Sequence, residues 1–426
     1  MAFQIQAKDS VLAFGPFATI NAVQNLNLDP TFNEENFSEL GNVNYTATSR
    51  MPETSGSFEV TSTGSIASIL ARMLYSYTTQ EYAYTAGTNN NYTITEADFE
   101  NCIFDVINLK APGTTFDEAV LVPNAQLTGM TLRLDATGVG SETFSFEADL
   151  QESLATPYHD LVTVPLDASS TDGTTATIPT AFNTIDSGTH AIVYVFVDNQ
   201  KYDDTVADWT SDDTVTLVGS AMSDAAPFER VSAVLAKRTP GTMPTITYPT
   251  DARFVKGDRA DIWLINSGTV GVDGLTDSNR LLRCQSVDIS IDLSRDKLSE
   301  IRRNNDLSTT YFRGLNYPLD ITVNVSILET GLAQYAALQN KTLDSAASMV
   351  GDVTIDTNNV MNLVDFDPAL DLYVKYYKTG NDNPLCTVTM TTLGITAFSE
   401  RQVVQGRGER TLSFIGSNIT IDGDDL

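Results

Sequence analysis

Two strand-like stretches of nearly the same pattern stand far apart in the chain. Thr143–Asp149 reads TFSFEAD and Thr411–Ser417 reads TLSFIGS, and each follows a segment that contains two glycines. Alternation of polar and apolar residues is typical of a strand with one buried face. One such match is weak by itself. The fold is constrained much more strongly if the elements around both stretches recur in the same order.

The segments upstream of the two stretches also resemble each other. Val23–Leu40 reads VQNLNLDPTFNEENFSEL and Val287–Ile301 reads VDISIDLSRDKLSEI. Both begin with alternating apolar residues, which predicts a strand. Both end in a related signature, FSEL in Phe37–Leu40 and LSEI in Leu298–Ile301, and Leu298 stands 261 positions after Phe37.

A polar segment follows each signature and is predicted to be a loop. Each loop closes on a proline, Pro52 or Pro318, and a strand-like run follows, Gly56–Val60 or Ile321–Val325. Proline is tolerated at the start of a strand because its missing N–H need not pair there. The polar loop, the proline and the strand therefore recur in the same order.

Each copy then turns helical. Ser65–Leu74 and Gly331–Leu338 carry apolar residues at helical spacing, which predicts one helix per copy with an apolar face against a sheet. Ser65 and Thr330 stand where an N-cap is expected.

Strands close both copies. Ala125–Asp135 leads through a glycine turn into TFSFEAD, and Thr387–Glu400 leads through another into TLSFIGS. The shared order of elements predicts an internal duplication, although identity between the copies is low. The alternative is two unrelated β-rich domains that share common turn residues.

The fold class expected from these patterns is mainly β, with sandwich- or barrel-forming sheets and one flanking helix per repeat. We assign copy 1 to residues 1–155 and copy 2 to residues 246–426. Residues 156–245 form a different segment, with strand runs such as His190–Val197 separated by Asp, Gly and Thr turns. This segment is either an inserted or decorating β module or a linker.

The chain is strongly acidic. It has 55 acidic and 25 basic residues and a formal net charge of −30. A protein that grips duplex nucleic acid needs clustered Lys and Arg, and this chain lacks such clusters. The acidity therefore predicts repulsion of nucleic acid. It also fits a high-salt habitat, or simply a soluble acidic protein.

Targeting and membrane signals are not evident in the sequence. The N-terminus lacks a basic region followed by an apolar run, and no apolar stretch reaches the roughly 18 residues of a membrane helix. We expect no membrane insertion. Cys102, Cys284 and Cys386 are widely spaced, so we expect buried thiols and folding inside a cell rather than a disulfide framework.

No catalytic pattern stands out. His159 and His190 are the two histidines, and neither has a companion at metal-ligand spacing. The acidic runs Asp365–Asp371 and Asp422–Asp425 lack the spacing of a calcium loop. A carboxylate pair for glycoside cleavage cannot be singled out among 55 acidic residues. We therefore expect no enzyme activity, no cofactor and no metal.

Several of these runs resemble one family. LNLDPTFNEENFSELG, MPETSGSFEV and SIASILARML, with the closing strands AQLTGMTLRLD and TFSFEAD, look like the core of a tail tube protein of long-tailed phages. The second copy is similar, although Arg302 and Arg303 replace the turn at Gly41 and Asn42. The resemblance covers about two thirds of the chain and rests on the pattern, without an invariant motif.

The resemblance implies a structural virion protein. Tube subunits form rings whose sheets close into a continuous barrel, and the rings stack into a hollow tube for the genome and the tape-measure protein. A chain with two tube domains is expected to form a homotrimer with pseudo-sixfold symmetry. Its other partners would be the tail terminator and baseplate proteins. It would assemble in the host cytoplasm and reside in the virion tail, and DNA would pass without specific binding.

Alternation within the strands selects candidate residues for the channel, because their neighbours Phe144, Phe146, Leu412 and Phe414 are expected to be buried. An ordinary solvent-facing strand face is the alternative. The candidate lumen-facing residues are Thr143, Ser145, Glu147, Thr411, Ser413, Asp288, Ser290 and Asp292. By resemblance alone, the segments 41–55 and 302–317 would make ring-to-ring contacts through Asn42, Asn44, Tyr45, Arg50, Arg303, Asn305, Tyr311 and Arg313.

Other functions remain as alternatives. Contractile injection and type VI secretion tubes share the fold, but they are usually short and single-domain. A tail terminator or baseplate ring is another virion part. A more distant alternative is an acidic β-rich surface adhesin, for which Trp209 and Trp263 are isolated aromatic residues. A hydrolase is the least favoured reading.

Overall fold

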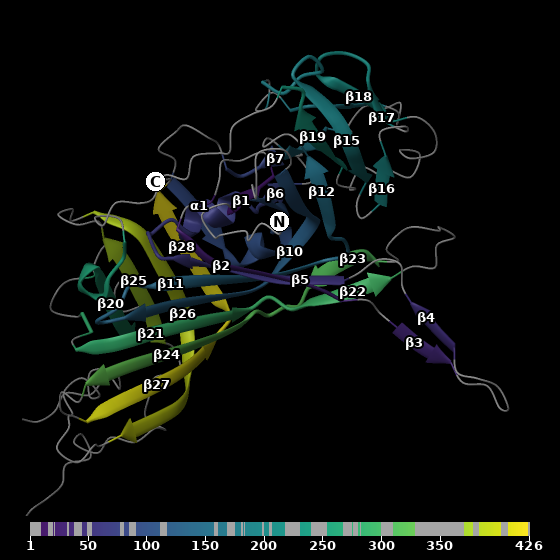
Figure 1. The fold of residues 1–426 in the computed structure, drawn as a ribbon. Helices are drawn as coiled ribbons and strands as arrows, with labels where there is room; N and C mark the ends of the chain where they lie inside the picture. Colours follow the sequence, from purple (N-terminus) through teal and green to yellow (C-terminus); the bar gives the residue numbers. More distant parts are fainter. Residues whose placement is uncertain are drawn as a thin grey trace, which may run out of the picture.

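The prediction of a mainly β fold is confirmed by a computed structural model of the chain (Figure 1). Its largest sheet is antiparallel and has 15 strands. The structure describes residues 10–15, 20, 22–31, 34–37, 45–48, 53–76, 81–84, 91–110, 117–156, 161–167, 175–179, 182, 184–197, 200–203, 207–217, 231–239, 254–266, 275, 280–281, 283–299, 310–328, 370–377, 383–401 and 408–424.

Two sets of four strands, in the same order, follow one another from one end of this sheet. The first half-sheet runs β2 (Val23–Thr31), β5 (Glu53–Thr61), β11 (Ser141–Ala148) and β10 (Asp117–Asp135). The second half-sheet continues with β21 (Cys284–Asp292), β24 (Asp320–Leu328), β27 (Glu409–Gly416) and β26 (Pro384–Arg401). The two half-sheets join where β10 pairs with β21.

The half-sheets match in their irregularities as well as in strand order. β2 has a register shift between Val23 and Asn25, and β21 has one between Cys284 and Ser286, again 261 positions later. The pairing of β10 with β11 and that of β26 with β27 also have register shifts at matching places. A bulge changes the twist and bend of a strand, so the two half-sheets are shaped alike. We call residues at such corresponding places matching positions.

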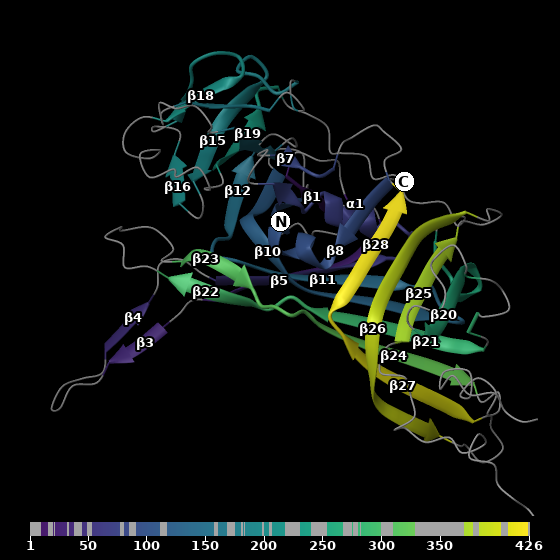
Figure 2. The same cartoon turned by 180° about the vertical axis from the view of Figure 1, so that it is seen from behind.

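A second layer of strands lies over the half-sheets. The long strands β10 and β26 belong to both layers (Figure 2). The first half of each strand pairs with strands of the second layer, and its last residues pair within a half-sheet. β8 and β28 pair with each other, so a strand of copy 1 joins a strand of copy 2. The second layer contains β1 (Ser10–Phe14), β9 (Ile103–Lys110), β12 (Glu152–Thr156), β8 (Asn91–Thr95), β20 (Ala260–Asn266), β25 (Leu370–Tyr377) and β28 (Asn418–Asp424).

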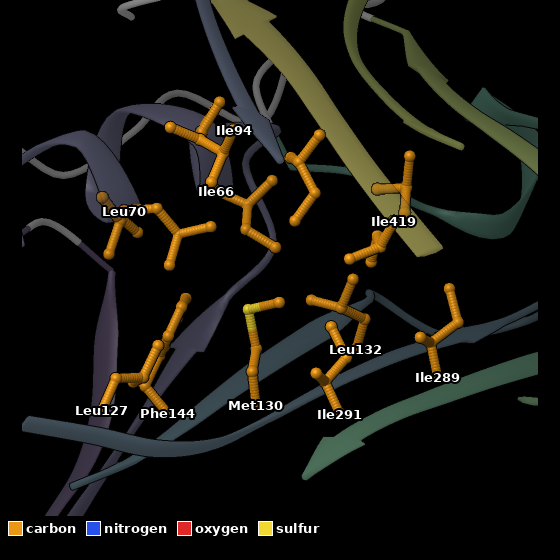
Figure 3. Close-up of a cluster of buried hydrophobic side chains, with 14 of the residues drawn as sticks. Ile66, Leu70, Ile94, Leu127, Met130, Leu132, Phe144, Ile289, Ile291 and Ile419 are labelled. Atoms are coloured by element: carbon orange, nitrogen blue, oxygen red, sulfur yellow. The ribbon is translucent and has the colours of Figure 1, made fainter. Parts of the chain in front are cut away.

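The core lies between the two layers and contains residues of both copies. Figure 3 shows Met130 and Leu132 beside Ile289 and Ile291, with Ile419 from the second layer facing them. All belong to one cluster of buried apolar side chains. The two copies therefore share a core and are joined by more than one strand pairing.

The helix predicted in copy 1 is confirmed as α1 (Ile66–Ala71), and all six of its residues are buried. Ser65 precedes it but makes no side-chain capping bond, since its hydroxyl pairs with that of Thr63 at 2.8 Å. A 3₁₀ helix follows β8 at Glu96–Asn101 and starts with a capping box. The second predicted helix, Gly331–Leu338, lies outside the described residues.

The two segments predicted as polar loops, residues 41–50 and 302–316, each contain one strand among the described residues, β4 and β23. In copy 1, β3 (Glu34–Phe37) pairs with β4 (Tyr45–Thr48). In copy 2, β22 (Arg295–Ser299) pairs with β23 (Thr310–Leu315). Each pair is a hairpin that extends the strands of its half-sheet. Prediction missed β4 and β23 because a hairpin that packs on no core has no apolar alternation to mark its strands.

The middle segment forms small sheets with their own core, and Val164, Leu166 and Val195 are among its fully buried residues. Another buried cluster joins this segment to copy 1, with Phe196 and Val234 beside Ile107 and Leu121. The middle segment is therefore packed against the second layer of copy 1. Its strands are β13 (Leu161–Leu166), β14 (Thr175–Thr177), β15 (His190–Val197), β16 (Gln200–Asp203), β17 (Ala207–Trp209), β18 (Thr214–Leu217) and β19 (Val231–Lys237).

A pair of short strands and a 3₁₀ turn complete the described structure. β6 (Tyr75–Ser76) and β7 (Glu81–Tyr82) pair directly after α1, and a 3₁₀ turn at Gly257–Arg259 leads into β20.

Candidate assembly interface

The candidate channel residues of copy 1 lie on the face of the sheet opposite the core. Thr143 stands directly opposite Thr131, and Thr131 stands opposite Ser290 of the second half-sheet. Directly opposed residues in a sheet share a face, as do residues two apart on a strand. Ser145 and Glu147 therefore lie on the same face as Ser290.

The same face continues across the second half-sheet. Asp288 stands opposite Asn324, and Asn324 stands opposite Ser413, whose hydroxyl donates to the Asn324 side-chain oxygen at 2.6 Å. Thr411 and Asp292 join this face through the two-residue repeat of their strands. All eight candidates thus share one face, which we call the polar face.

Burial on the other side of the sheet is as predicted. Phe144, Phe146, Leu412 and Phe414 are all buried. The ring of Phe144 stacks on that of Phe58 with centroids 4.9 Å apart. The core face of the sheet is therefore mainly apolar and the opposite face mainly polar in both halves, and the exceptions include Glu142 on the core face and Ile415 on the polar face.

The polar face is mainly acidic. Arg133 is a cation on it, and its Nε lies 3.3 Å from Asp135 Oδ2 and 3.6 Å from Asp288 Oδ1. Burial raises the pKa of Asp288. The nearby charge of Arg133 lowers this pKa, and the charge of Asp135 raises it. Acidic residues at register positions on this face are Asp29, Glu53, Glu59, Asp135, Glu147, Asp288, Asp292, Asp320 and Glu409.

The two ends of the paired half-sheets are open edges. Within the described part of the chain, β2 pairs only with β5. Among the same residues, the last stretch of β26, Gly394–Arg401, pairs only with β27. An unpaired edge presents free N–H and C=O groups that can pair with another strand.

Apolar side chains at these edges are less covered than their matching residues inside the sheet. Leu26 and Leu28 of β2 are half-buried, whereas the matching Val287 and Ile289 of β21 are only 2% and 1% exposed. The difference arises because β21 has a neighbour on both sides and β2 has one.

β26 shows the same contrast. Ile395 and Phe398 are half-buried, whereas the matching Leu127 and Met130 of β10 are buried. The edge of the second half-sheet therefore carries the incompletely covered apolar residues that a further strand would bury.

The hairpin β22–β23 is held on the first half-sheet by ion pairs, and we call it the docked hairpin. Arg313 is 6% exposed, and its Nη1 lies 2.8 Å from Glu147 Oε2 while its Nη2 lies 2.5 Å from Asp149 Oδ1. Lys297 Nζ pairs with Glu53 and lies 3.4 Å from Asp149 Oδ1. Cationic side chains of copy 2 thus neutralise acidic side chains of copy 1.

Backbone carbonyls hold the base of the docked hairpin. The Arg295 guanidinium donates to Leu127 O at 3.1 Å and to Phe99 O at 2.6 Å. Both acceptors belong to copy 1. Charge-assisted bonds of this kind are about twice as strong as neutral ones, so the docked hairpin reinforces the joint between the half-sheets.

Among the ring-stacking candidates, the side chain of Arg313 is described, and it is buried against its own chain. Its contacts with Glu147 and Asp149 are intrachain, so Arg313 holds the docked hairpin rather than forming a free surface. Tyr45 and Tyr311 lie in β4 and β23. The remaining candidates lie outside the described residues: Asn42, Asn44, Arg50, Arg303 and Asn305.

One buried carboxyl in the core was missed by sequence analysis. Glu142 is buried, accepts a bond from the Ser62 hydroxyl at 2.7 Å, and has its pKa raised to about 7 by burial, against the lowering effect of that bond. The alternation of the strand could have revealed this residue, because Glu142 stands next to the polar-face residue Thr143 and therefore falls at a core position.

The described residues contain no group of three or more His, Cys, Asp or Glu side chains that could hold a metal ion. Cys102 and Cys284 are free thiols whose pKa is raised to about 12 by burial. Asp371 is buried and accepts from the Thr392 N–H at 3.1 Å, so its role here is structural. No helix among the described residues is long and apolar enough to cross a membrane.

Comparison with known proteins does not identify the chain. No model of a protein family matches it, and no curated protein matches it. The functional argument therefore rests on the open edges, the polar face and the docked hairpin.

Proposed function

We propose that this chain is the major tube protein of a viral tail, and that three copies associate head to tail into a ring with six similar half-sheets. Stacked rings would form a hollow tube in the virion. The joint between β10 and β21 is the observation that supports this most directly, because it is a complete example of one half-sheet paired to the next.

The internal joint predicts the register of the joint between chains. Thr131 stands opposite Ser290 within the chain. The residue of β26 that matches Thr131 is Ser399, because Ser399 stands opposite Thr411 as Thr131 stands opposite Thr143. The residue of β2 that matches Ser290 is Asp29, which stands 261 positions before it. Pairing of β26 with β2 of a second copy would therefore place Ser399 opposite Asp29.

Burial of edge residues would drive this association. Leu26 and Leu28 would gain the cover that Val287 and Ile289 already have. Each CH₂ group removed from water contributes about 0.8 kcal/mol. The edge N–H and C=O groups would also find partners, which removes the hazard of unspecific pairing.

A head-to-tail interface joins two different surfaces and closes into a ring when the rotation allows it. Closure leaves no open edge. Each chain contributes two half-sheets, so three chains supply the six that the resemblance to single-domain hexameric tubes implies.

The polar face is assigned to the channel. Its many carboxylates would repel the phosphates of a passing genome, and Arg133 is held by Asp135 and Asp288. A channel of this kind lets DNA slide without sequence-specific contact. The middle segment, which packs on the second layer of copy 1, would then lie on the outside of the ring.

The partners proposed beyond the chain itself are the tape-measure protein within the tube and terminator and baseplate proteins at its ends. Electron microscopy of the purified chain, with class averages tested for symmetry, examines the central claim. Rings or tubes with threefold symmetry and six similar lobes are expected. Monomers that form no rings at any salt concentration would refute the proposal.

A further inference from the structure

The chain contains two hairpins at matching positions, but only one of them is docked. The docked hairpin continues β21, and the hairpin β3–β4, which we call the arm, continues β2. Figures 1 and 2 show the arm set apart from the sheet. The two hairpins have the same strand register. Asn36 stands opposite Thr46 in the arm, and the matching residues Lys297 and Arg313 stand opposite each other in the docked hairpin.

The arm lacks the cations of the docked hairpin. Arg313 stands 267 positions after Thr46, and Lys297 stands 261 positions after Asn36, the same shifts that relate the flanking strands. Uncharged residues thus occupy the places of Lys297 and Arg313, whereas Glu34 occupies the place of Arg295.

The surface that matches the docking site has lost two of its three carboxylates. The docked hairpin contacts Glu147, Asp149 and Glu53. The residues of copy 2 that match Glu147 and Asp149, 268 positions later, are Ile415 and Ser417, and Asp320 matches Glu53. Ile415 is 46% exposed, one of the few large apolar side chains so exposed among the described residues. The cations of Arg313 and Lys297 and the carboxylates of Glu147 and Asp149 are thus replaced together, as expected if the arm contacts this surface.

We propose that the arm of one chain packs on the surface around Ile415 and Ser417 of a second copy of this chain, in the way that the docked hairpin packs on copy 1. This inference rests on the head-to-tail association proposed above. The second junction would lack ion pairs at the places of Arg313, Glu147 and Asp149 and would cover Ile415, whereas the junction inside the chain is ionic.

Sheet order explains why a second copy must provide the surface. The docked hairpin starts at β21 and reaches β11, two strands away across β10. In its own chain, β2 is six strands from β27, which is about 29 Å at a strand spacing of about 4.8 Å. With β2 paired to β26 of a second copy, that copy's β27 lies two strands away, the distance that the docked hairpin spans.

Thiol crosslinking of assembled particles tests the contact. Thr46→Cys is combined with Ile415→Cys in a chain that carries Cys284→Ser, and a short bismaleimide is added. We expect crosslinks between chains, ending at covalent trimers on a denaturing gel. The internal reference is Glu53→Cys with Lys297→Cys, which should crosslink within one chain because these residues touch in the docked hairpin.

A matched control places the second cysteine at an exposed site elsewhere. Val139 lies in the turn before β11, at the opposite end of that strand from Glu147, and Thr46→Cys with Val139→Cys should give no crosslinked trimers. A ladder extending beyond trimers from Thr46 and Ile415 would show that the arm contacts the next ring, and would overturn the proposal.

The same experiment separates this inference from the proposed function. Intact threefold rings without the crosslink between Thr46 and Ile415, together with a positive internal reference, would overturn the arm contact alone. Failure of the purified chain to form rings would overturn the tube proposal and the arm contact together.

Discussion

Arg313 Nη2 lies 2.5 Å from Asp149 Oδ1, and both residues are almost fully buried although they come from opposite copies. Each charge is costly to bury alone and is stabilised by the other. Glu147 provides Arg313 with a second carboxylate, and Lys297 provides Asp149 with a second cation. The joint between the copies is thus strengthened by ionic contacts in addition to the pairing of β10 with β21.

Arg313→Ala should destabilise this joint. Removal of one partner leaves the other charge buried, and we expect a loss of about 3 kcal/mol, moderated by Lys297 beside Asp149. Denaturant unfolding measures the change. Arg313→Met combined with Asp149→Leu should be much less destabilising than the single change, and an equally unstable double variant would contradict the ionic interpretation.

Glu142 should make stability fall as the pH rises. Its pKa is raised from 4.5 to about 7 in the folded protein, so the neutral form is favoured on folding. The full stability is present below pH 4.5 and is lost progressively as the pH rises towards 7, by about 3 kcal/mol in total.

The matched variant for this effect is Glu142→Gln, which keeps the shape and cannot ionise. It should be more stable than the parent at pH 8 and should flatten the pH dependence of the unfolding midpoint between pH 4.5 and 7. A parent-like pH profile in Glu142→Gln would assign the dependence to other groups.

Cysteines at the predicted contact between chains should form disulfide-linked trimers. Asp29→Cys with Ser399→Cys places the thiols at the positions that match Ser290 and Thr131, which are directly opposed. Opposed residues in antiparallel strands have Cα atoms about 4.5–5.5 Å apart, within disulfide range. Gel electrophoresis without reductant detects the product.

Two further pairs calibrate that result. Thr131→Cys with Ser290→Cys should form an intrachain disulfide, and Asp29→Cys with Ala397→Cys should form little, because it is two residues out of register. Equal yields from the in-register and shifted pairs would argue against a defined register.

Leu28→Lys should weaken ring formation while leaving the chain folded. Leu28 is half-buried at the open edge, and a charge there would be buried on pairing with a second copy. We expect the dissociation constant to rise about tenfold or more, equal to about 1.4 kcal/mol. Light scattering measures association, and circular dichroism measures folding.

The matching change Ile289→Lys is the control for Leu28→Lys. Ile289 is buried between two strands, so this variant should fail to fold. If Leu28→Lys unfolds the chain equally, Leu28 belongs to the core and the edge interpretation is wrong.

Association should strengthen with salt. Each chain carries a formal charge of −30, so chains repel one another, and added salt screens this repulsion over about 10 Å at 0.1 M. Sedimentation of the chain at increasing NaCl concentration should show a rising fraction of rings. A fraction that falls with salt would indicate that attractive charge pairs dominate the contact between chains.

Much of the sheet could be predicted from the sequence alone. Phe144, Phe146, Leu412 and Phe414 are buried as the alternating pattern indicates, because side chains in a strand point to opposite faces with a strict period of two. The order of strands in each copy was also readable, since its turns and signatures lie close together in the sequence.

The contacts of the hairpins could not be predicted in this way. The segments that contain Tyr45 and Arg313 look like polar loops, because neither has the apolar alternation of a strand that packs on a core. The meeting of Arg313 with Asp149 spans 164 residues, and no local pattern marks it.

The sequence by itself determined which side chains of each strand face the core and that two similar sets of strands exist. Only the tertiary structure decided that β10 pairs with β21, so that the two sets share one sheet and one core. Strand pairing uses backbone N–H and C=O groups that every residue except proline has, so the sequence does not specify the partner locally. The choice depends on which arrangement buries the apolar faces together and satisfies the charges between them.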